Sequence, residues 1–207
     1  MNENVQYGCG LSAPASWRNF DTSPTLRLQR LPLVGPRLHG KALPLFPPNA
    51  EYGDIVKGLP IPTGSCSGIY CSHVLEHLAL EDFRTALRNT YAYLRDGGIF
   101  RFVLPDLKHL ARVYVESDDP GASLVFMEQS MLGKPRRARG VGGLLRDWLG
   151  NSAHMWMWDY ASMSAELERA GFRDIRRAQF GDSADPHFHD VEDPGRWENC
   201  LGVECVK

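Results

Sequence analysis

The sequence contains no long apolar run, no CxxC pair and almost no excess of charge of either sign. In its 207 residues no apolar stretch approaches the ~20 residues that a bilayer-spanning helix needs. The first residues do not show the basic and then apolar pattern of a secretory signal peptide. We therefore expect a cytoplasmic protein that has no membrane partner.

The formal net charge is only −2, which gives no reason to expect a nucleic-acid partner. One basic cluster, residues 134–139, could attract a phosphate or an acidic sugar, although a solvated basic loop is the simpler interpretation. The five cysteines are odd in number and include residues of expected core strands. We expect them to be reduced thiols that pack as small apolar side chains.

The sequence gives little support for a metal site. Without a CxxC pair, the usual cysteine spacing of a structural zinc site is missing. Residues 187–190, HFHD, bring two histidines and a carboxylate together, but a third ligand would have to come from elsewhere. Because loop histidines of this kind are usually solvated, we predict that no metal is bound.

The clearest structural pattern lies in residues 68–107, where a strand, a helix and a second strand follow one another. GIYCSHVLEHL, residues 68–78, is typical of a strand that runs into a polar turn. The next segment repeats apolar residues every three or four positions, as an amphipathic helix does, at Leu80, Phe83, Leu87, Tyr91 and Leu94. Gly97 and Gly98 are predicted to end this helix before the second strand. Two consecutive parallel strands indicate a buried α/β sheet.

Shorter elements are predicted on both sides of this unit. Strands are expected at residues 5–10, 17–21, 51–57, 172–180 and 199–206. Helices are expected within 22–50, over 107–117, and in a segment that Ser162 caps and Gly171 ends. The length suits a single domain over residues 1–207, with residues 108–158 as a lid or substrate-binding insertion.

The link between the first two strands is unusually short. Only six residues separate Gly10 from Trp17, fewer than the dozen or so of a usual parallel crossover. Either this link is an extended loop without a helix, or one of the two strands is misread.

Five motifs follow one another along the chain: GCG at 8–10, W-x-N-x-D at 17–21, VLEHL at 74–78, GG at 97–98 and PDL at 105–107. Their order and spacing resemble the class I S-adenosylmethionine-dependent methyltransferases, specifically the short bacterial, type 11-like enzymes. Two positions depart from that family, because Gln6 stands where an acidic residue is usual and Ser12 where a third glycine is usual. The resemblance implies a Rossmann-like sheet of order 3-2-1-4-5-7-6, with the last strand antiparallel and the first helix missing.

The resemblance also implies S-adenosylmethionine as the cofactor, bound at the carboxyl ends of the strands. Gly8, Cys9 and Gly10 would face its methionine and ribose, because glycine lets the backbone approach a ligand closely. Asp21 would accept hydrogen bonds from the ribose hydroxyls. A plain tight turn for the glycines, and a turn or cap aspartate for Asp21, remain the simpler alternatives.

Other candidate residues follow the third and fourth strands. Asp54 would lie near the adenine, and Ser72 and His73 would close the pocket. His73 is also the candidate general base for the acceptor, although the simpler interpretation is that it only caps the next helix or makes a local hydrogen bond, since many methyltransferases need no base. Glu76 and His77 are expected to be structural.

His154 and Asp159 flank the aromatic stretch MWMW and could reach over the pocket from the lid, or their aromatic neighbours could belong to the core.

The function predicted in this way is methyl transfer from S-adenosylmethionine to a small-molecule or glycan-precursor acceptor. The alternative is a protein that binds S-adenosylmethionine or S-adenosylhomocysteine and has lost catalysis, which the missing helix, Gln6 and Ser12 suggest. A nicotinamide-dependent oxidoreductase is less favoured because a full G-x-G-x-x-G is absent. A sheet face left uncovered by the missing helix would favour a homodimer.

Overall fold

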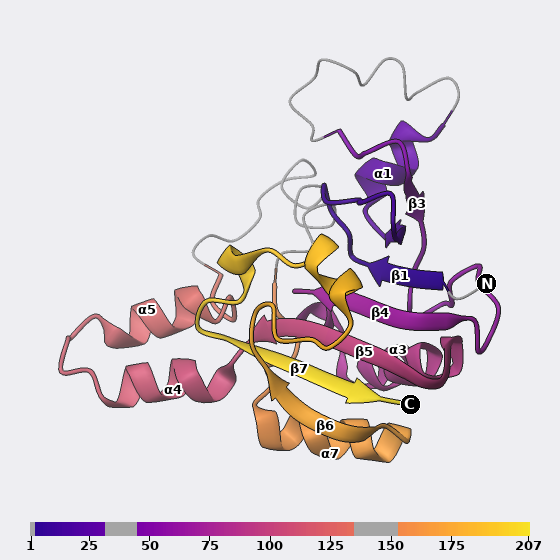
Figure 1. The fold of residues 1–207 in the computed structure, drawn as a ribbon. Helices are drawn as coiled ribbons and strands as arrows, with labels where there is room; N and C mark the ends of the chain where they lie inside the picture. Colours follow the sequence, from indigo (N-terminus) through magenta and orange to yellow (C-terminus); the bar gives the residue numbers. More distant parts are fainter. Residues whose placement is uncertain (1–2, 32–44, 135–152) are drawn as a thin grey trace.

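The computed structural model describes residues 3–31, 45–134 and 153–207, which build a seven-stranded sheet of order β3-β2-β1-β4-β5-β7-β6 (Figure 1). The strands are β1 Glu3–Tyr7, β2 Arg18–Asp21, β3 Ala50–Tyr52, β4 Cys66–Ser72, β5 Leu94–Pro105, β6 Arg173–Ala178 and β7 Cys200–Val206. The pairs from β3 to β5 are parallel, and β7 runs antiparallel to both β5 and β6. The predicted Rossmann-like α/β sheet, with its strand order and antiparallel last strand, is therefore confirmed.

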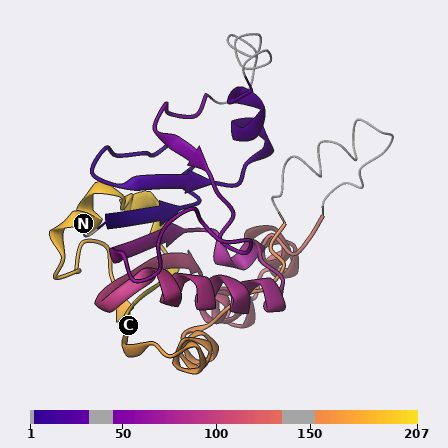
Figure 2. The same cartoon turned by 90° about the vertical axis from the view of Figure 1, so that its right-hand side faces the viewer.

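Helices cover one face of this sheet and also form an arm beside it (Figures 1 and 2). The helices are α1 Pro24–Gln29, α3 Leu80–Tyr93, α4 Leu107–Val115, α5 Ala122–Gln129 and α7 Tyr160–Ala170, and the 3-10 turns are η1 Leu75–His77, η2 Pro186–Asp190 and η3 Pro194–Arg196. Side chains of α3 and α7 join the main apolar core under the sheet. No helix in the described parts of the chain is long and apolar enough to cross a membrane.

The arm of α4 and α5 leaves the sheet and returns to it at one place. α4 starts after Asp106, whose side chain caps the helix by accepting hydrogen bonds from the N–H groups of Lys108 and His109. The chain returns at Trp158, which forms a parallel bridge with Asp106 and accepts a hydrogen bond from the Leu107 N–H at 2.8 Å. None of the residues of α4 is buried.

The helix α3 follows its predicted periodicity but ends earlier than predicted. Phe83 and Leu87 are buried in the main core. The helix ends at Tyr93, and β5 begins directly at Leu94, which is fully buried and has an extended backbone. Gly97 and Gly98 therefore belong to β5 and do not end the helix, because burial of Leu94 takes the chain straight into the sheet.

The helix α7 begins with a cap that differs from the prediction. Asp159 is the N-cap, and its carboxylate accepts a hydrogen bond from the Ser162 N–H at 2.8 Å. Ser162 completes a capping box by accepting from the Asp159 N–H at 3.3 Å. Asp159 thus stabilises a helix terminus instead of reaching over a pocket, while Gly171 ends the helix as predicted.

The link between β1 and β2 is the extended loop that its length allows, and the described residues 8–17 contain no helix. Two buried amides hold this loop in place. Gln6 Nε2 donates to the Ser12 carbonyl at 2.7 Å and to Asn19 Oδ1 at 2.6 Å. Asn19 Nδ2 in turn donates to the carbonyls of Pro14 at 3.0 Å and Trp17 at 2.7 Å. Gln6, one of the two departures from the family pattern, therefore has a structural role.

The sheet face opposite α3 is covered by the segment 179–199. Phe188 of this segment packs against Trp17 and Tyr70, with ring centroids 5.4 and 6.4 Å away. The indole N–H of Trp17 donates to the His187 carbonyl at 3.0 Å. The uncovered face that suggested a homodimer is thus filled by the chain itself, and the oligomeric state stays a prediction without that support.

A buried arginine ties this covering segment to the sheet. Arg101 of β5 has no exposed surface, and its guanidinium donates to Glu192 Oε1 at 2.5 Å. The same group donates to Asp182 Oδ1 at 2.9 Å and Glu204 Oε2 at 3.0 Å. It also lies 4.6 Å from the ring centroid of Trp197. One cation therefore holds two carboxylates of the covering segment and one of β7.

The middle of β7 has no room for a side chain, and we expect Gly202→Ala to lower the free energy of unfolding by about 1–3 kcal/mol. A Cβ at Gly202 would lie 2.2 Å from Trp197 Cζ3 and 2.5 Å from the Ala178 carbonyl oxygen, so the sheet or the indole must shift. Urea denaturation measures the change. Gly195→Ala is the matched control, because its Cβ would meet only an ordinary contact at 3.4 Å, and an equal loss in both variants would contradict the steric argument.

Candidate functional site

The predicted cofactor site begins at the turn that follows β1. Gly8 has a positive φ of 71°, and a Cβ there would lie 2.2 Å from Val74 Cγ2. The turn can therefore pack directly against the loop after β4 only if this residue is glycine. Gly10 also has a positive φ, and a Cβ there would meet no atom within 4 Å. Its surroundings are open, as the close approach of a ligand requires.

Asp21 lies at the carboxyl end of β2 and faces this turn. Its Oδ2 accepts a hydrogen bond from the Gly10 N–H at 2.8 Å, and its Oδ1 accepts from the Ser23 N–H at 2.7 Å. The carboxylate thus joins the turn after β1 to the residues that start α1. The structure brings Gly8, Gly10 and Asp21 together as predicted.

Cys9 points away from the turn. Its side chain is buried with Leu26 and Ala50 in a small apolar cluster. Burial raises the pKa of the Cys9 thiol to about 12, with the nearby Asp21 carboxylate adding to the effect. Only the backbone of Cys9 can therefore face a ligand, and the thiol is neither a ligand contact nor a nucleophile.

Asp54 lies beyond the end of β3. The predicted strand 51–57 is shorter in the structure, and Asp54 occupies the turn that follows. Its carboxylate accepts a hydrogen bond from the Val56 N–H at 3.0 Å and pairs with the Lys57 ammonium at 2.9 Å. This residue is held by its own turn, at the same edge of the sheet as Asp21.

Ser72 ends β4 and His73 follows it, and both are held by an arginine that no sequence motif had indicated. Arg196 of η3 donates from Nε to Ser72 Oγ at 3.0 Å, and its carbonyl lies 3.0 Å from His73 Nε2. His73 has a positive φ of 54°. Because these partners are more than 120 positions apart in the chain, no local pattern could have indicated the contact.

The environment of His73 does not favour a role as general base. Burial alone would lower the pKa of His73, but its contacts with the Cys200 sulfur, the Glu76 carboxylate and the Arg196 carbonyl outweigh burial and raise the pKa to about 10. A ring that keeps its proton at neutral pH is not ready to accept another. Its assignment as the base stays a prediction.

His154 does not reach over an open pocket, because it is buried against the loop after β4. Its Nδ1 lies 2.8 Å from the Ser130 carbonyl, and its ring makes an edge contact with that of His77 at a centroid distance of 4.9 Å. Burial lowers the pKa of His154, which keeps the ring neutral.

Of the basic cluster 134–139, residues 135–139 lie outside the described residues.

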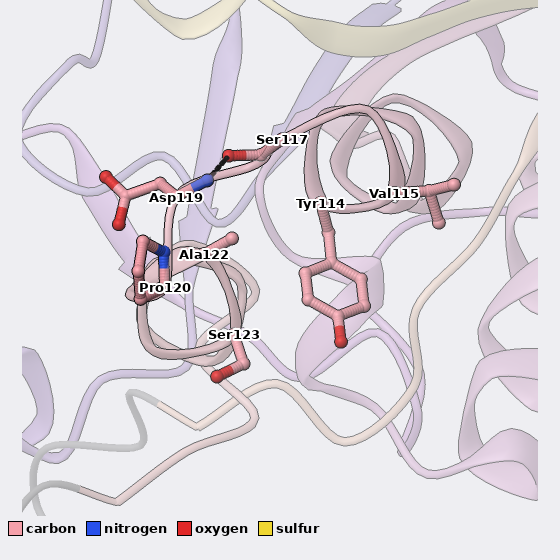
Figure 3. Close-up of a pocket in the computed structure, with 7 residues that line it drawn as sticks. All are labelled: Tyr114, Val115, Ser117, Asp119, Pro120, Ala122 and Ser123. Carbon is pink, nitrogen blue, oxygen red and sulfur yellow. Dashed lines mark hydrogen bonds between the residues drawn. The ribbon is translucent and has the colours of Figure 1, made fainter.

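The arm beside the sheet carries a separate hollow (Figure 3). It has a volume of about 440 Å³ and lies between the end of α4 and the start of α5, where Tyr114 and Ser123 line it. At its rim the Asp119 N–H donates to Ser117 Oγ at 3.2 Å (Figure 3). None of the predicted cofactor residues lines this hollow.

The geometry at the carboxyl ends of β1, β2 and β4 combines an open glycine turn with a fixed carboxylate. Backbone groups of the turn can approach a ligand closely, and a carboxylate is a strong acceptor for hydroxyl groups. This combination suits a ligand that carries a sugar, in the position where open α/β sheets bind nucleotides.

Comparison with known proteins agrees with this geometry. A family model described as a methyltransferase domain matches residues 20–176. No curated protein matches the sequence.

Several solved structures share the fold. An S-adenosylmethionine-dependent methyltransferase from Archaeoglobus fulgidus is 15% identical with a TM-score of 0.52, and the match covers 100% of this chain and 86% of that one. One from Thermotoga maritima is 13% identical with a TM-score of 0.54, covering 100% and 83%. One from Mesorhizobium loti is 18% identical with a TM-score of 0.51, covering 99% and 90%. At such identities the matches establish the fold.

Proposed function

This chain belongs to the methyltransferase domain family, and from that premise we propose that it transfers the methyl group of S-adenosylmethionine to a small-molecule or glycan-precursor acceptor. The observation that carries the cofactor assignment is the junction of the 8–10 turn with Asp21, where the Gly10 N–H donates to the carboxylate. Nucleotide-type ligands bind at this edge of an open α/β sheet.

The residues at this junction fit the cofactor. Asp21 uses one acceptor site on each oxygen for a backbone N–H, and each oxygen keeps a second site for a ribose hydroxyl. Gly8 and Gly10 leave the backbone open for the methionine and ribose portion. Asp54, fixed by Val56 and Lys57, is assigned to the adenine side.

When bound, S-adenosylmethionine supplies an electrophilic methyl group on a sulfonium. The protein then has mainly to hold the acceptor atom in line, about 3 Å from that methyl. We assign Ser72, His73 and Arg196 to the wall that positions the two reactants, because they are joined to one another at the end of β4. His73 acts there by position, since its ring is held through Nε2 and keeps its proton.

The alternative, a binding protein without catalysis, was suggested by Gln6, Ser12 and the missing helix. The structure gives these features a different explanation. In the structure Gln6 donates to the Ser12 carbonyl and so replaces the helix with a fixed loop, leaving the glycine turn and Asp21 joined.

Thermal unfolding with added ligand tests the cofactor assignment. S-adenosylmethionine or S-adenosylhomocysteine at about a hundred times its dissociation constant should stabilise the protein by ~2.7 kcal/mol. For a domain of this size the midpoint should rise by roughly 5–10 °C. NAD at the same concentration is the control and should give no shift. A shift with NAD alone, or none with either adenosyl ligand, would refute the assignment.

A further inference from the structure

Three side chains with metal-ligating atoms meet beside the proposed cofactor site. Glu76 and His77 come from η1, and His154 comes from the segment that returns from the arm. Each offers one ligand atom, and these atoms lie within 4.8 Å of one another. Glu76 and His154 are buried and His77 is partly buried, so the cluster is not a solvated surface group.

Backbone carbonyls orient both imidazoles. His77 Nδ1 lies 3.1 Å from the Ala153 carbonyl, and His154 Nδ1 lies 2.8 Å from the Ser130 carbonyl. A carbonyl only accepts, so in each ring Nδ1 carries the proton and Nε2 keeps its lone pair. Metal-bound histidines are held in this way, with one nitrogen donating to a carbonyl and the other free for the ion.

The Glu76 carboxylate provides a second, independent observation. It has no exposed surface, and among the described residues neither of its oxygens has a hydrogen-bond partner. His73 Nδ1 is 3.2 Å from Oε1, but the angles do not make a hydrogen bond, and His154 Nε2 is 4.0 Å from the same oxygen. Both of these neighbours lie near Oε1, so the protonated His73 ring faces only one side of the carboxylate. A buried Oε2 without a hydrogen bond is costly unless a further cation satisfies it.

The backbone fixes the distance between the two segments. The N–H groups of Met155 and Trp156 both donate to the Glu76 carbonyl, at 2.8 and 3.1 Å. His154 is therefore held next to Glu76 by contacts that do not involve either side chain. The ligand atoms, which lie within 4.8 Å of one another, would have to approach to about 3.4 Å, the separation that tetrahedral bonds of 2.0–2.1 Å require.

We propose that Glu76, His77 and His154 bind a Zn²⁺ ion. Two imidazoles and one carboxylate form a donor set that zinc accepts, and three protein ligands leave a fourth tetrahedral position for water. Within the parts of the chain that the structure describes, no other histidine, cysteine, aspartate or glutamate joins this group.

The ion would lie next to the glycine turn of residues 8–10. Val74, two positions before Glu76, is the residue that a Cβ at Gly8 would strike. Zinc would also fasten the segment returning from the arm to the loop after β4, in addition to the two backbone hydrogen bonds. This proposal is independent of the proposed methyl transfer, and zinc binding can be measured without cofactor or acceptor.

Zinc binding to chelator-treated protein tests the proposal. Competition with a chromophoric chelator should show one equivalent of Zn²⁺ bound to the wild-type chain. His77→Gln, His154→Gln and Glu76→Gln should each weaken binding by about 100-fold or more, since even outer contacts of a metal site are worth 10- to 100-fold. His187→Gln is the matched control, because His187 is exposed in the HFHD segment and pairs with Asp185. It should bind zinc as the wild type does.

Two further measurements keep the test decisive if a variant fails to fold. Wild-type protein loaded with Co²⁺ should show the intense visible bands of a tetrahedral ion, and X-ray absorption of the zinc form should show two imidazoles. The proposal is overturned if no equivalent of zinc binds, because Glu76 is then balanced by His73 alone. It is equally overturned if His187→Gln removes the binding and His154→Gln does not.

Discussion

Arg101→Met is expected to lower the free energy of unfolding by about 3–5 kcal/mol, because it removes the cation from a buried group of carboxylates. Glu192 is as fully buried as Arg101, and Glu204 is nearly so. Methionine fills similar space but leaves these charges without a partner. The contact with Trp197 is lost as well, so we expect the 179–199 segment to detach from the sheet before the rest of the protein unfolds.

Urea denaturation followed by tryptophan fluorescence measures this effect, since Trp197 and Trp17 report on the segment. Arg173→Met is the control: this arginine is mostly exposed and only 3.8 Å from the carboxylate of its neighbour Asp174. An exposed pair of this kind is worth about 0–1 kcal/mol. If Arg101→Met costs no more than the control, the buried cation does not hold the segment.

Asp21→Ala is expected to weaken binding of S-adenosylhomocysteine by at least about 100-fold. Two hydrogen bonds from ribose hydroxyls to a carboxylate are lost, and each contributes ~1.5–3 kcal/mol. The Gly10 N–H loses its acceptor in the same variant, so the turn is also less well fixed. The affinity of Asp21→Asn should lie between those of the wild type and Asp21→Ala, because the amide keeps one oxygen that can accept a hydrogen bond.

Isothermal titration calorimetry gives the affinities directly. Glu51→Ala is the matched control: it removes an exposed carboxylate from the neighbouring strand β3, where the side chain pairs with Arg18. Its affinity should equal that of the wild type. Unchanged affinity in Asp21→Ala would remove the assigned ribose site, and equal losses in both variants would point to general electrostatics instead of a specific contact.

The parts of the fold that could be predicted are those with a local signal. The apolar repeat of α3 and the alternation in β7 follow from spacing alone, and the motifs from the GCG turn to PDL implied the strand order. The turn at Gly8 and its partner Asp21 could be identified because short motifs carry them. The ends of the helices and strands were less predictable. The prediction that Gly97 ends α3 was wrong, because the helix already ends at Tyr93, where burial of Leu94 takes the chain into β5.

The remainder could not be predicted because its contacts join distant positions. Arg101 occurs in an apolar strand, where nothing indicates that Glu192 and Glu204 neutralise it. His154 has no motif of its own, and only folding brings it to Glu76. The absence of CxxC pairs argued against zinc, yet it says nothing about ligands drawn from histidine and glutamate.

The meeting of Leu107 and Trp158 at a single backbone hydrogen bond makes the intervening chain a cassette. Because its two ends lie together, we expect changes of length between α5 and residue 153 to leave the register of β5 and the start of α7 unchanged. The entropic cost of a longer cassette grows only with the logarithm of its length. Evolution can therefore exchange this segment while the sheet and the glycine turn of residues 8–10 are inherited intact.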